Sequence, residues 1–131
     1  MQQTDVDSDN KPQLLYLEDD PVLSETMTAL LEMSDFNVFH ANNTEKAVAH
    51  INKNHLVPHL ILADKRLLYG ECGIESVTTI RNLLSTEVPA ILLTGDSDIS
   101  NEDQKKTPLQ RILLKPVDID KLIREIQQLL A

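Results

Sequence analysis

The chain has few of the residues on which several classes of protein depend. Its 131 residues include one cysteine, three glycines, no tryptophan and only 3% aromatic residues. A single cysteine, Cys72, excludes an internal disulfide and favours a reducing compartment. Three glycines are too few for a dinucleotide-binding fingerprint, and no Gly-x-x-x-x-Gly-Lys phosphate loop occurs, so we expect no nucleotide site. The core must be aliphatic.

Basic residues and long apolar runs are also scarce. Lys and Arg number 12 against 21 Asp and Glu, which gives a formal net charge of −9. This charge repels nucleic acid and anionic lipid headgroups, so we expect no nucleic-acid contact by this chain. The apolar runs are too short to span a bilayer, and the N-terminus lacks the features of a signal peptide. We therefore expect a cytoplasmic protein without membrane contact.

The length fits one domain preceded by a tail. Residues 1–12 are acidic with almost nothing to bury, which predicts a flexible acidic tail or linker, and the domain is expected over 13–131. Amphipathic segments there alternate with apolar runs too short for helices, which predict strands. The runs are LLYL (14–17), NVFHA (37–41), LILA (60–63), AILLT (90–94) and RILL (111–114). Asp118 is placed to cap the last helix, and the polar segment 97–107 predicts only a short one.

This alternation predicts the fold. Five strand–helix units with continuously apolar strands indicate an α/β domain, a doubly wound five-stranded parallel sheet with helices on both faces. In such domains ligands bind beyond the carboxyl ends of the strands. The residues at those ends are therefore the candidates for a functional site.

Three acidic residues stand at two of these strand ends. Glu18 and Asp19 follow the first strand, and Asp64 follows the third. Crowded carboxylates repel one another unless a cation or hydrogen-bond donors compensate. The simpler interpretation is a polar turn, with Asp20 capping a helix that Pro21 begins. That interpretation explains Asp20 but neither of the two acids before it.

A hydroxyl and an ammonium group follow the next two strands, at Thr94 and Lys115. Carboxylate oxygens, supplemented by water and phosphate oxygens, are typical of a Mg²⁺ site. A hydroxyl and an ammonium group suit the remaining oxygens of a phosphoryl group, whose transfer depends on positioning and charge neutralisation. The strand ends thus predict a Mg²⁺-dependent phosphoryl site.

In this combination the chain resembles the receiver domain of two-component response regulators, over about 13–130. The resemblance places its acidic metal-binding pair at Glu18 and Asp19, its phosphoacceptor at Asp64, its Ser/Thr at Thr94, and its Lys-Pro step at Lys115 and Pro116. It implies the flavodoxin-like (βα)5 receiver fold. It also implies a cis peptide before Pro116, where proline lowers the cost of the cis form.

The resemblance further implies a function. Asp64 would accept a phosphoryl group from a phosphohistidine of a histidine kinase or histidine phosphotransfer domain, or from a small phosphodonor. Mg²⁺ would be held by the three acids, with Glu18 acting through water, and by the backbone carbonyl of Arg66. Thr94 and Lys115 would contact the phosphoryl oxygens. Such a domain is a signalling phosphoacceptor that promotes its own phosphotransfer and dephosphorylation, not an enzyme with a separate substrate. A homodimer is compatible with it.

The segment 63–75, ADKRLLYGECGIE, departs from the commonest family pattern. Leu68 stands where proline is usual, and one extra residue precedes Gly73. This variant is similar to receivers attached to some hybrid histidine kinases, as is PAILLTGDS (89–97). Ile112 replaces the aromatic switch residue of many members, which argues against signalling by aromatic rotation. The chain is then a single-domain receiver or a part of a larger hybrid kinase.

Two charged residues outside the family pattern suggest a gate. Arg66 lies two positions after Asp64, and Asp96 two positions after Thr94. We hypothesise that Arg66 and Asp96 pair across the mouth of the site and hinder the water that would hydrolyse an acyl phosphate. The alternative is that both point to solvent. Faster loss of the phosphoryl group after replacing both by Ala would support the gate.

Two other functions stay open. A haloacid-dehalogenase-like phosphohydrolase also uses an aspartate nucleophile and Mg²⁺, but it requires a second acid where this chain has Arg66. A degenerate receiver would act only as a protein-interaction module, against which the intact Asp64, Thr94 and Lys115 argue. His55 and His59 have the spacing of a helical metal pair, but Pro58 between them favours a loop.

Overall fold

The computed structural model describes residues 11–67, 70–95 and 110–131. These ranges contain β1 (Gln13–Leu17), α2 (Pro21–Met33), β2 (Asn37–Ala41), α3 (Thr44–Asn54), β3 (Leu60–Asp64), α4 (Gly73–Leu84), β4 (Ala90–Thr94), β5 (Gln110–Leu114) and α5 (Ile119–Leu130). The five predicted strands are confirmed to within one residue at each end. The short helix predicted at 97–107 lies outside the described residues. Within the described ranges, no helix has both the length and the apolar character that crossing a membrane requires.

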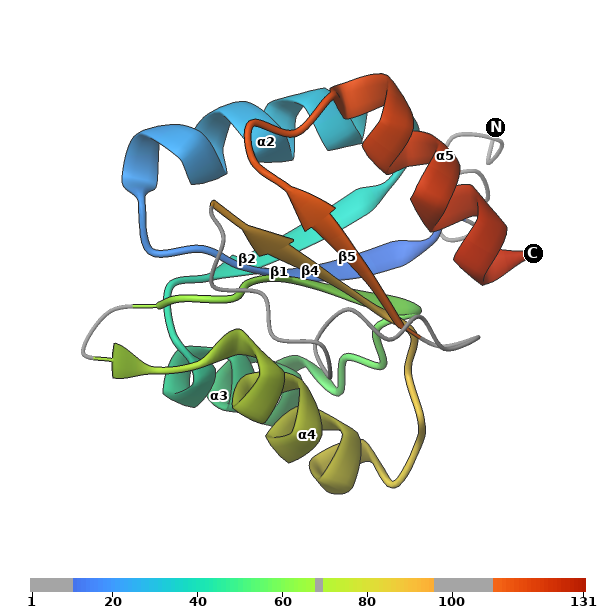
Figure 1. The fold of residues 1–131 in the computed structure, drawn as a ribbon. Coiled ribbons are helices and arrows are strands. Elements are labelled where there is room, and N and C mark those ends of the chain that lie inside the picture. Colours follow the sequence, from blue (N-terminus) through green and yellow to red (C-terminus); the bar gives the residue numbers. More distant parts are fainter. Residues whose placement is uncertain (1–10, 68–69, 96–109) are drawn as a thin grey trace.

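The strands form one parallel sheet in the order β2-β1-β3-β4-β5. Helices α2 and α5 cover one face, and α3 and α4 cover the other (Figure 1). The prediction of a doubly wound sheet is therefore confirmed. The chain moves outward from β1 to β2 and then returns to place β3 on the other side of β1. This reversal puts the topological switch point between β1 and β3, where Glu18, Asp19 and Asp64 emerge.

Two apolar layers hold the helices to the sheet. All residues of β3 and β4 are buried, because both faces of these central strands are covered. Alternate residues of β1 enter opposite layers, with Leu15 facing α3 and α4 and Leu14 facing α2 and α5. Buried residues of the helices complete the layers: Met27 and Leu31 of α2, Leu122 and Ile126 of α5, Ala47 and Ile51 of α3, and Val77 and Ile80 of α4. The central strands are thus firmly anchored behind the site.

Side-chain caps begin two of the helices as predicted. The carboxylate of Asp20 accepts hydrogen bonds from the backbone N–H groups of Val22 and Leu23, with Pro21 in the first turn. Asp118 caps α5 by accepting from the N–H of Asp120 at 3.0 Å. Capping therefore accounts for Asp20.

As predicted, the two histidines near the connection from α3 to β3 do not form a helical pair. His55 is the C-cap of α3 and has a left-handed φ of 50°. His59 lies beyond the helix, where its Nδ1 accepts a hydrogen bond from the backbone N–H of Gln13 at 2.9 Å. The helix ends before Pro58, so the two imidazoles do not share a helical face.

Candidate functional site

Three acidic side chains converge at the carboxyl ends of β1 and β3. Glu18 and Asp19 directly follow β1, and Asp64 is the last residue of β3. One carboxylate oxygen from each lies within 4.8 Å of the other two. Glu18 is 1% exposed and Asp64 is 8% exposed. The structure thus brings together the three acids that the strand-end rule selected.

Lys115, directly after β5, reaches two of these acids. Its Nζ donates to Oδ2 of Asp64 at 2.7 Å and to Oε1 of Glu18 at 3.3 Å. Its backbone N–H donates to the carbonyl of Thr94 at 2.7 Å, which ties the residue to the end of β4. The following peptide bond, Lys115-Pro116, is cis, which confirms the prediction from the family resemblance.

Backbone donors fix the second oxygen of both acids. The N–H of Arg66 donates to Oδ1 of Asp64 at 3.2 Å, and the N–H of Asp20 donates to Oε2 of Glu18 at 3.2 Å. Each carboxylate therefore has one oxygen on the backbone and the other on Lys115. This arrangement orients both groups without filling all their acceptor positions.

The site shifts the pKa values of Glu18 and Lys115. Burial raises the pKa of Glu18 to about 7, the charge of Asp64 adds to this increase, and the Asp20 N–H and the Lys115 ammonium oppose it. Burial alone would lower the pKa of Lys115, but hydrogen bonding to Asp64 and the charges of Asp64 and Glu18 raise it overall. The three acids are the hard oxygen donors that suit Mg²⁺.

Thr94 lies at the same edge of the sheet. It is the last residue of β4, it is 2% exposed, and it pairs in register with Leu114 beside it on β5. Its neighbour on the other side, β3, aligns Asp64 with Leu93. A Cβ added at Gly95 would meet no heavy atom of the described residues within 4 Å. Asp96 lies outside the described residues, so its pairing with Arg66 stays a hypothesis.

Sequence reasoning missed two residues that support the site. Nε2 of His40 lies 2.7 Å from the carbonyl oxygen of Glu18, and its ring packs beside that of Tyr16. Gly73 begins α4 so close to β3 that an added Cβ would lie 2.2 Å from the carbonyl oxygen of Asp64. No sequence signal indicates the first contact, because it depends on the strand register that pairs Tyr16 with His40. The presence of one of only three glycines near the site could have indicated the second.

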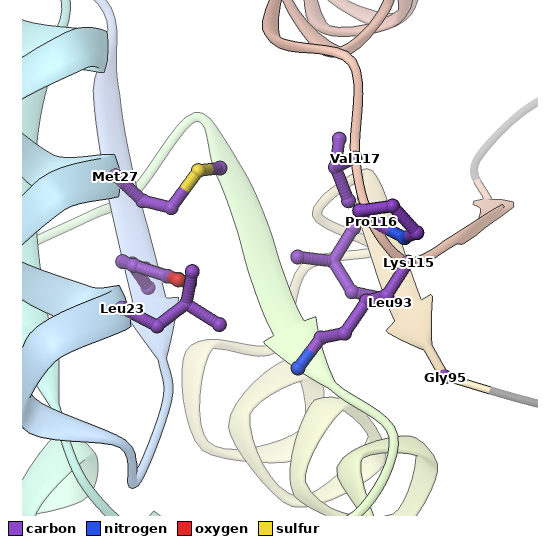
Figure 2. Close-up of a pocket in the computed structure, with 8 residues that line it drawn as sticks. Leu23, Met27, Leu93, Gly95, Lys115, Pro116 and Val117 are labelled. Carbon is purple, nitrogen blue, oxygen red and sulfur yellow. The ribbon is translucent and has the colours of Figure 1, made fainter.

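A cavity of about 490 Å³ adjoins Lys115. Leu23 and Met27 of α2 lie on one side of it, and Pro116 and Val117 on the other (Figure 2). Tyr16 also lines it, and its buried hydroxyl has no hydrogen-bond partner among the described residues. Burial, and then the charges of the nearby acids, raise the pKa of this phenol strongly, so it stays neutral.

Comparison with known proteins identifies the family. The chain matches the response regulator receiver domain over residues 14–127. It is 32% identical over 88 residues to the phyllosphere-induced regulator PhyR of Methylorubrum extorquens, which is 67% of this chain and 32% of PhyR. It is 33% identical over 92 residues to the phosphate regulon transcriptional regulatory protein PhoB of Pseudomonas aeruginosa, which is 70% of this chain and 39% of PhoB. The chain belongs to the response regulator receiver domain family.

The fold agrees with this assignment. A solved response regulator receiver domain (CheY-like) from Methylobacillus flagellatus matches with a TM-score of 0.76 and 24% identity, over 92% of this chain and 99% of that one. The two curated relatives are longer proteins, and the aligned region spans about a third of their length. The shared part is thus the receiver domain, which is a signalling domain.

Proposed function

We propose that this domain receives a phosphoryl group from a phosphohistidine onto Asp64. The observation that carries the proposal is the position of the Asp64 carboxylate. It lies in hydrogen-bond contact with Lys115 at 2.7 Å and beside Glu18 and Asp19, at the topological switch point of the sheet. Family membership supports the same role, since receiver domains are phosphoacceptors in two-component signalling.

The transfer step follows from this geometry. A carboxylate oxygen of Asp64 attacks the phosphorus and forms a new P–O bond, while the P–N bond to the donor imidazole breaks. The imidazole nitrogen keeps the electron pair of that bond, and Asp64 becomes an acyl phosphate. Lys115 offsets the negative charge that gathers on the phosphoryl oxygens. The Thr94 hydroxyl donates to one of these oxygens, and the N–H of Arg66 keeps the attacking carboxylate in place.

The site also fits Mg²⁺. Glu18, acting through water, together with Asp19, Asp64 and the backbone carbonyl of Arg66, would supply its oxygen ligands. When bound, the ion supplies positive charge beside the phosphoryl group. Because burial raises the pKa of Glu18 to about 7, this residue would have to lose its proton to contribute negative charge beside the ion.

The proposal extends to the setting of the domain. The receiver would comprise residues 13–131, and most of the tail expected over 1–12 lies outside the described residues. The phosphodonor would be a histidine kinase or a histidine phosphotransfer domain in the cytoplasm. PhyR and PhoB are named as regulators, which fits a phosphoacceptor placed upstream of a regulatory output. Attachment to a hybrid histidine kinase, and a homodimer, are parts of the same hypothesis.

Labelling by acetyl phosphate in the presence of Mg²⁺ tests the proposal. Stable stoichiometric labelling that disappears in Asp64→Asn supports the phosphoacceptor role. Rapid multiple turnover of acetyl phosphate would favour the phosphohydrolase, and no labelling would favour the interaction module. Asp35→Asn is a matched control, because this exposed residue precedes β2 at the opposite edge of the sheet. It should label like the parent.

A further inference from the structure

The β3–α4 connection, which carries Arg66, folds back on itself directly after Asp64. The N–H of Leu67 donates to the carbonyl of Glu71 at 2.8 Å, and the N–H of Gly73 donates to the carbonyl of Lys65 at 2.8 Å. Arg66 and Cys72 form an antiparallel bridge between them. The segments 65–67 and 71–73 therefore lie side by side. We call them the two arms of the 65–73 hairpin, of which residues 68 and 69 lie outside the described residues.

The side chain of Glu71 links this hairpin to two helices. Its Oε1 accepts hydrogen bonds from the backbone N–H of Thr44 at 2.7 Å and from the Thr44 hydroxyl, at the start of α3. The hydroxyl of Ser76, in α4, lies 3.5 Å from the same oxygen and 2.6 Å from the Thr44 hydroxyl. Ser76 is only 2% exposed, whereas Glu71 and Thr44 are half-buried.

The start of α3 needs this contact. Asn43 is the N-cap of the helix, and its side chain accepts from the N–H of Lys46 at 2.8 Å. The first N–H groups of a helix have no partner within it, and the cap leaves that of Thr44 to be satisfied elsewhere. A carboxylate suits this position, because the N-terminus of a helix carries partial positive charge. Glu71 thus completes the capping of α3 from a neighbouring loop.

The hairpin is also in tight contact with the phosphoacceptor. Gly73 ends the second arm, where an added Cβ would lie 2.2 Å from the carbonyl oxygen of Asp64 and 3.2 Å from the Cα of Lys65. There is no room for a side chain between Gly73 and the backbone at the end of β3. A shift of the second arm must therefore move the backbone of Lys65 and Arg66, and the N–H of Arg66 donates to Oδ1 of Asp64.

We propose that Glu71 is a positioning residue, whose carboxylate straps the 65–73 hairpin to α3 and so holds the backbone of Arg66 in the phosphoacceptor site. This inference rests on the proposed function, in which the Arg66 carbonyl is a Mg²⁺ ligand. Glu71 itself does not touch the reacting atoms. Its effect passes through the hydrogen bonds between the two arms.

Calorimetric titration of the full chain with Mg²⁺ tests the strap. Supporting groups around metal ligands change affinity by about 10–100-fold, and we expect the lower limit, about tenfold weaker binding, in Glu71→Ala. Glu71→Gln should lose less, because an amide oxygen still accepts from the N–H of Thr44. Glu45→Ala is the control, since Glu45 is an exposed acid in the same first turn of α3. Its Mg²⁺ affinity should stay within about twofold of the parent.

A second measurement separates positioning from a simple loss of charge. In Mg²⁺-free protein, amide hydrogen exchange at Leu67 and Gly73 should be faster in Glu71→Ala than in Glu45→Ala. Equal Mg²⁺ affinity in these two variants, or unchanged exchange at the two amides, would overturn the strap. If Glu71→Ala does not fold, Thr44→Val replaces it, with about threefold weaker binding expected from the loss of one hydroxyl donor. A parent that binds no Mg²⁺ would instead contradict the proposed function.

Discussion

Lys115→Met is expected to destabilise the protein most where both of its acidic partners are ionised. Met keeps much of the length and the apolar stem of Lys but removes the ammonium group. Removing one partner of a buried ion pair costs about 3–5 kcal/mol, whereas exposed pairs are worth about 0–1 kcal/mol. The Lys115 side chain is 24% exposed, and those of Glu18 and Asp64 are 1% and 11% exposed. We therefore expect a loss of about 2–3 kcal/mol near pH 8.

The destabilisation caused by Lys115→Met should depend on pH because of Glu18. Burial raises the pKa of Glu18 from 4.5 to about 7 in the folded protein. The folded state thus holds this proton more tightly than the unfolded chain. This bound proton stabilises the folded protein fully below pH 4.5, and the stabilisation is lost as the pH rises towards 7. At about 1.4 kcal/mol per pH unit, the free energy of unfolding falls by about 3 kcal/mol over this range. Lys115 lowers the pKa of Glu18, so Lys115→Met raises it. The variant should therefore continue to lose stability above pH 7.

Urea unfolding, followed by circular dichroism without divalent ions, measures these free energies. We expect a smaller difference between parent and variant near pH 5, about 1–2 kcal/mol, since Glu18 is then protonated and the contact with Asp64 dominates. Lys121→Met is the control, because Lys121 is exposed on α5 and the chemical change is the same. The reasoning is refuted if Lys115→Met is no more destabilising than Lys121→Met, or if its effect does not increase with pH.

Three further outcomes follow from the same structure. Gly73→Ala should lower the free energy of unfolding by about 1–3 kcal/mol, because its Cβ would lie 2.2 Å from the Asp64 carbonyl oxygen. Gly95→Ala is the comparison, since its Cβ meets no atom of the described residues within 4 Å, and equal urea midpoints of the two variants would contradict the expectation. Tyr16→Phe should leave the free energy of unfolding unchanged or raise it by up to about 1–3 kcal/mol. The reason is that it removes a buried hydroxyl without a partner among the described residues. Clear destabilisation would show that the hydroxyl is hydrogen-bonded. Mg²⁺ affinity should fall as the pH decreases below about 7, because Glu18 becomes protonated. If the affinity measured by calorimetric titration does not change with pH, Glu18 does not belong to the site.

The strands, and the position of the candidate site residues at one edge of the sheet, were predictable because one rule connects them. Apolar runs that are too short for helices predicted the strands, and the carboxyl ends of parallel strands must meet at one edge. That rule selected Glu18, Asp19, Asp64, Thr94 and Lys115 before any contact was known. The caps at Asp20 and Asp118 were predictable for a local reason, since each side chain bonds to backbone two or three residues away.

The contacts that support the site were not predictable in this way. Glu71 bonds to Thr44, which lies 27 residues earlier, and only the packing of α3 beside α4 brings the two together. The 63–75 segment has no alternation of apolar and polar residues that would predict a hairpin. His40 reaches the carbonyl of Glu18 across two strands whose register the sequence does not specify. Such contacts depend on tertiary arrangement and not on local spacing.

Locating the acyl phosphate shows directly whether Asp64 is the phosphoacceptor. The parent is treated with acetyl phosphate and Mg²⁺, the acyl phosphate is reduced with borohydride, and peptides are analysed by mass spectrometry. Reduction converts a phosphorylated aspartate to homoserine and leaves free aspartates unchanged. If Asp64 is the phosphoacceptor, homoserine appears at position 64 and not at positions 19 and 20. Homoserine at another aspartate, with position 64 unmodified, would contradict it.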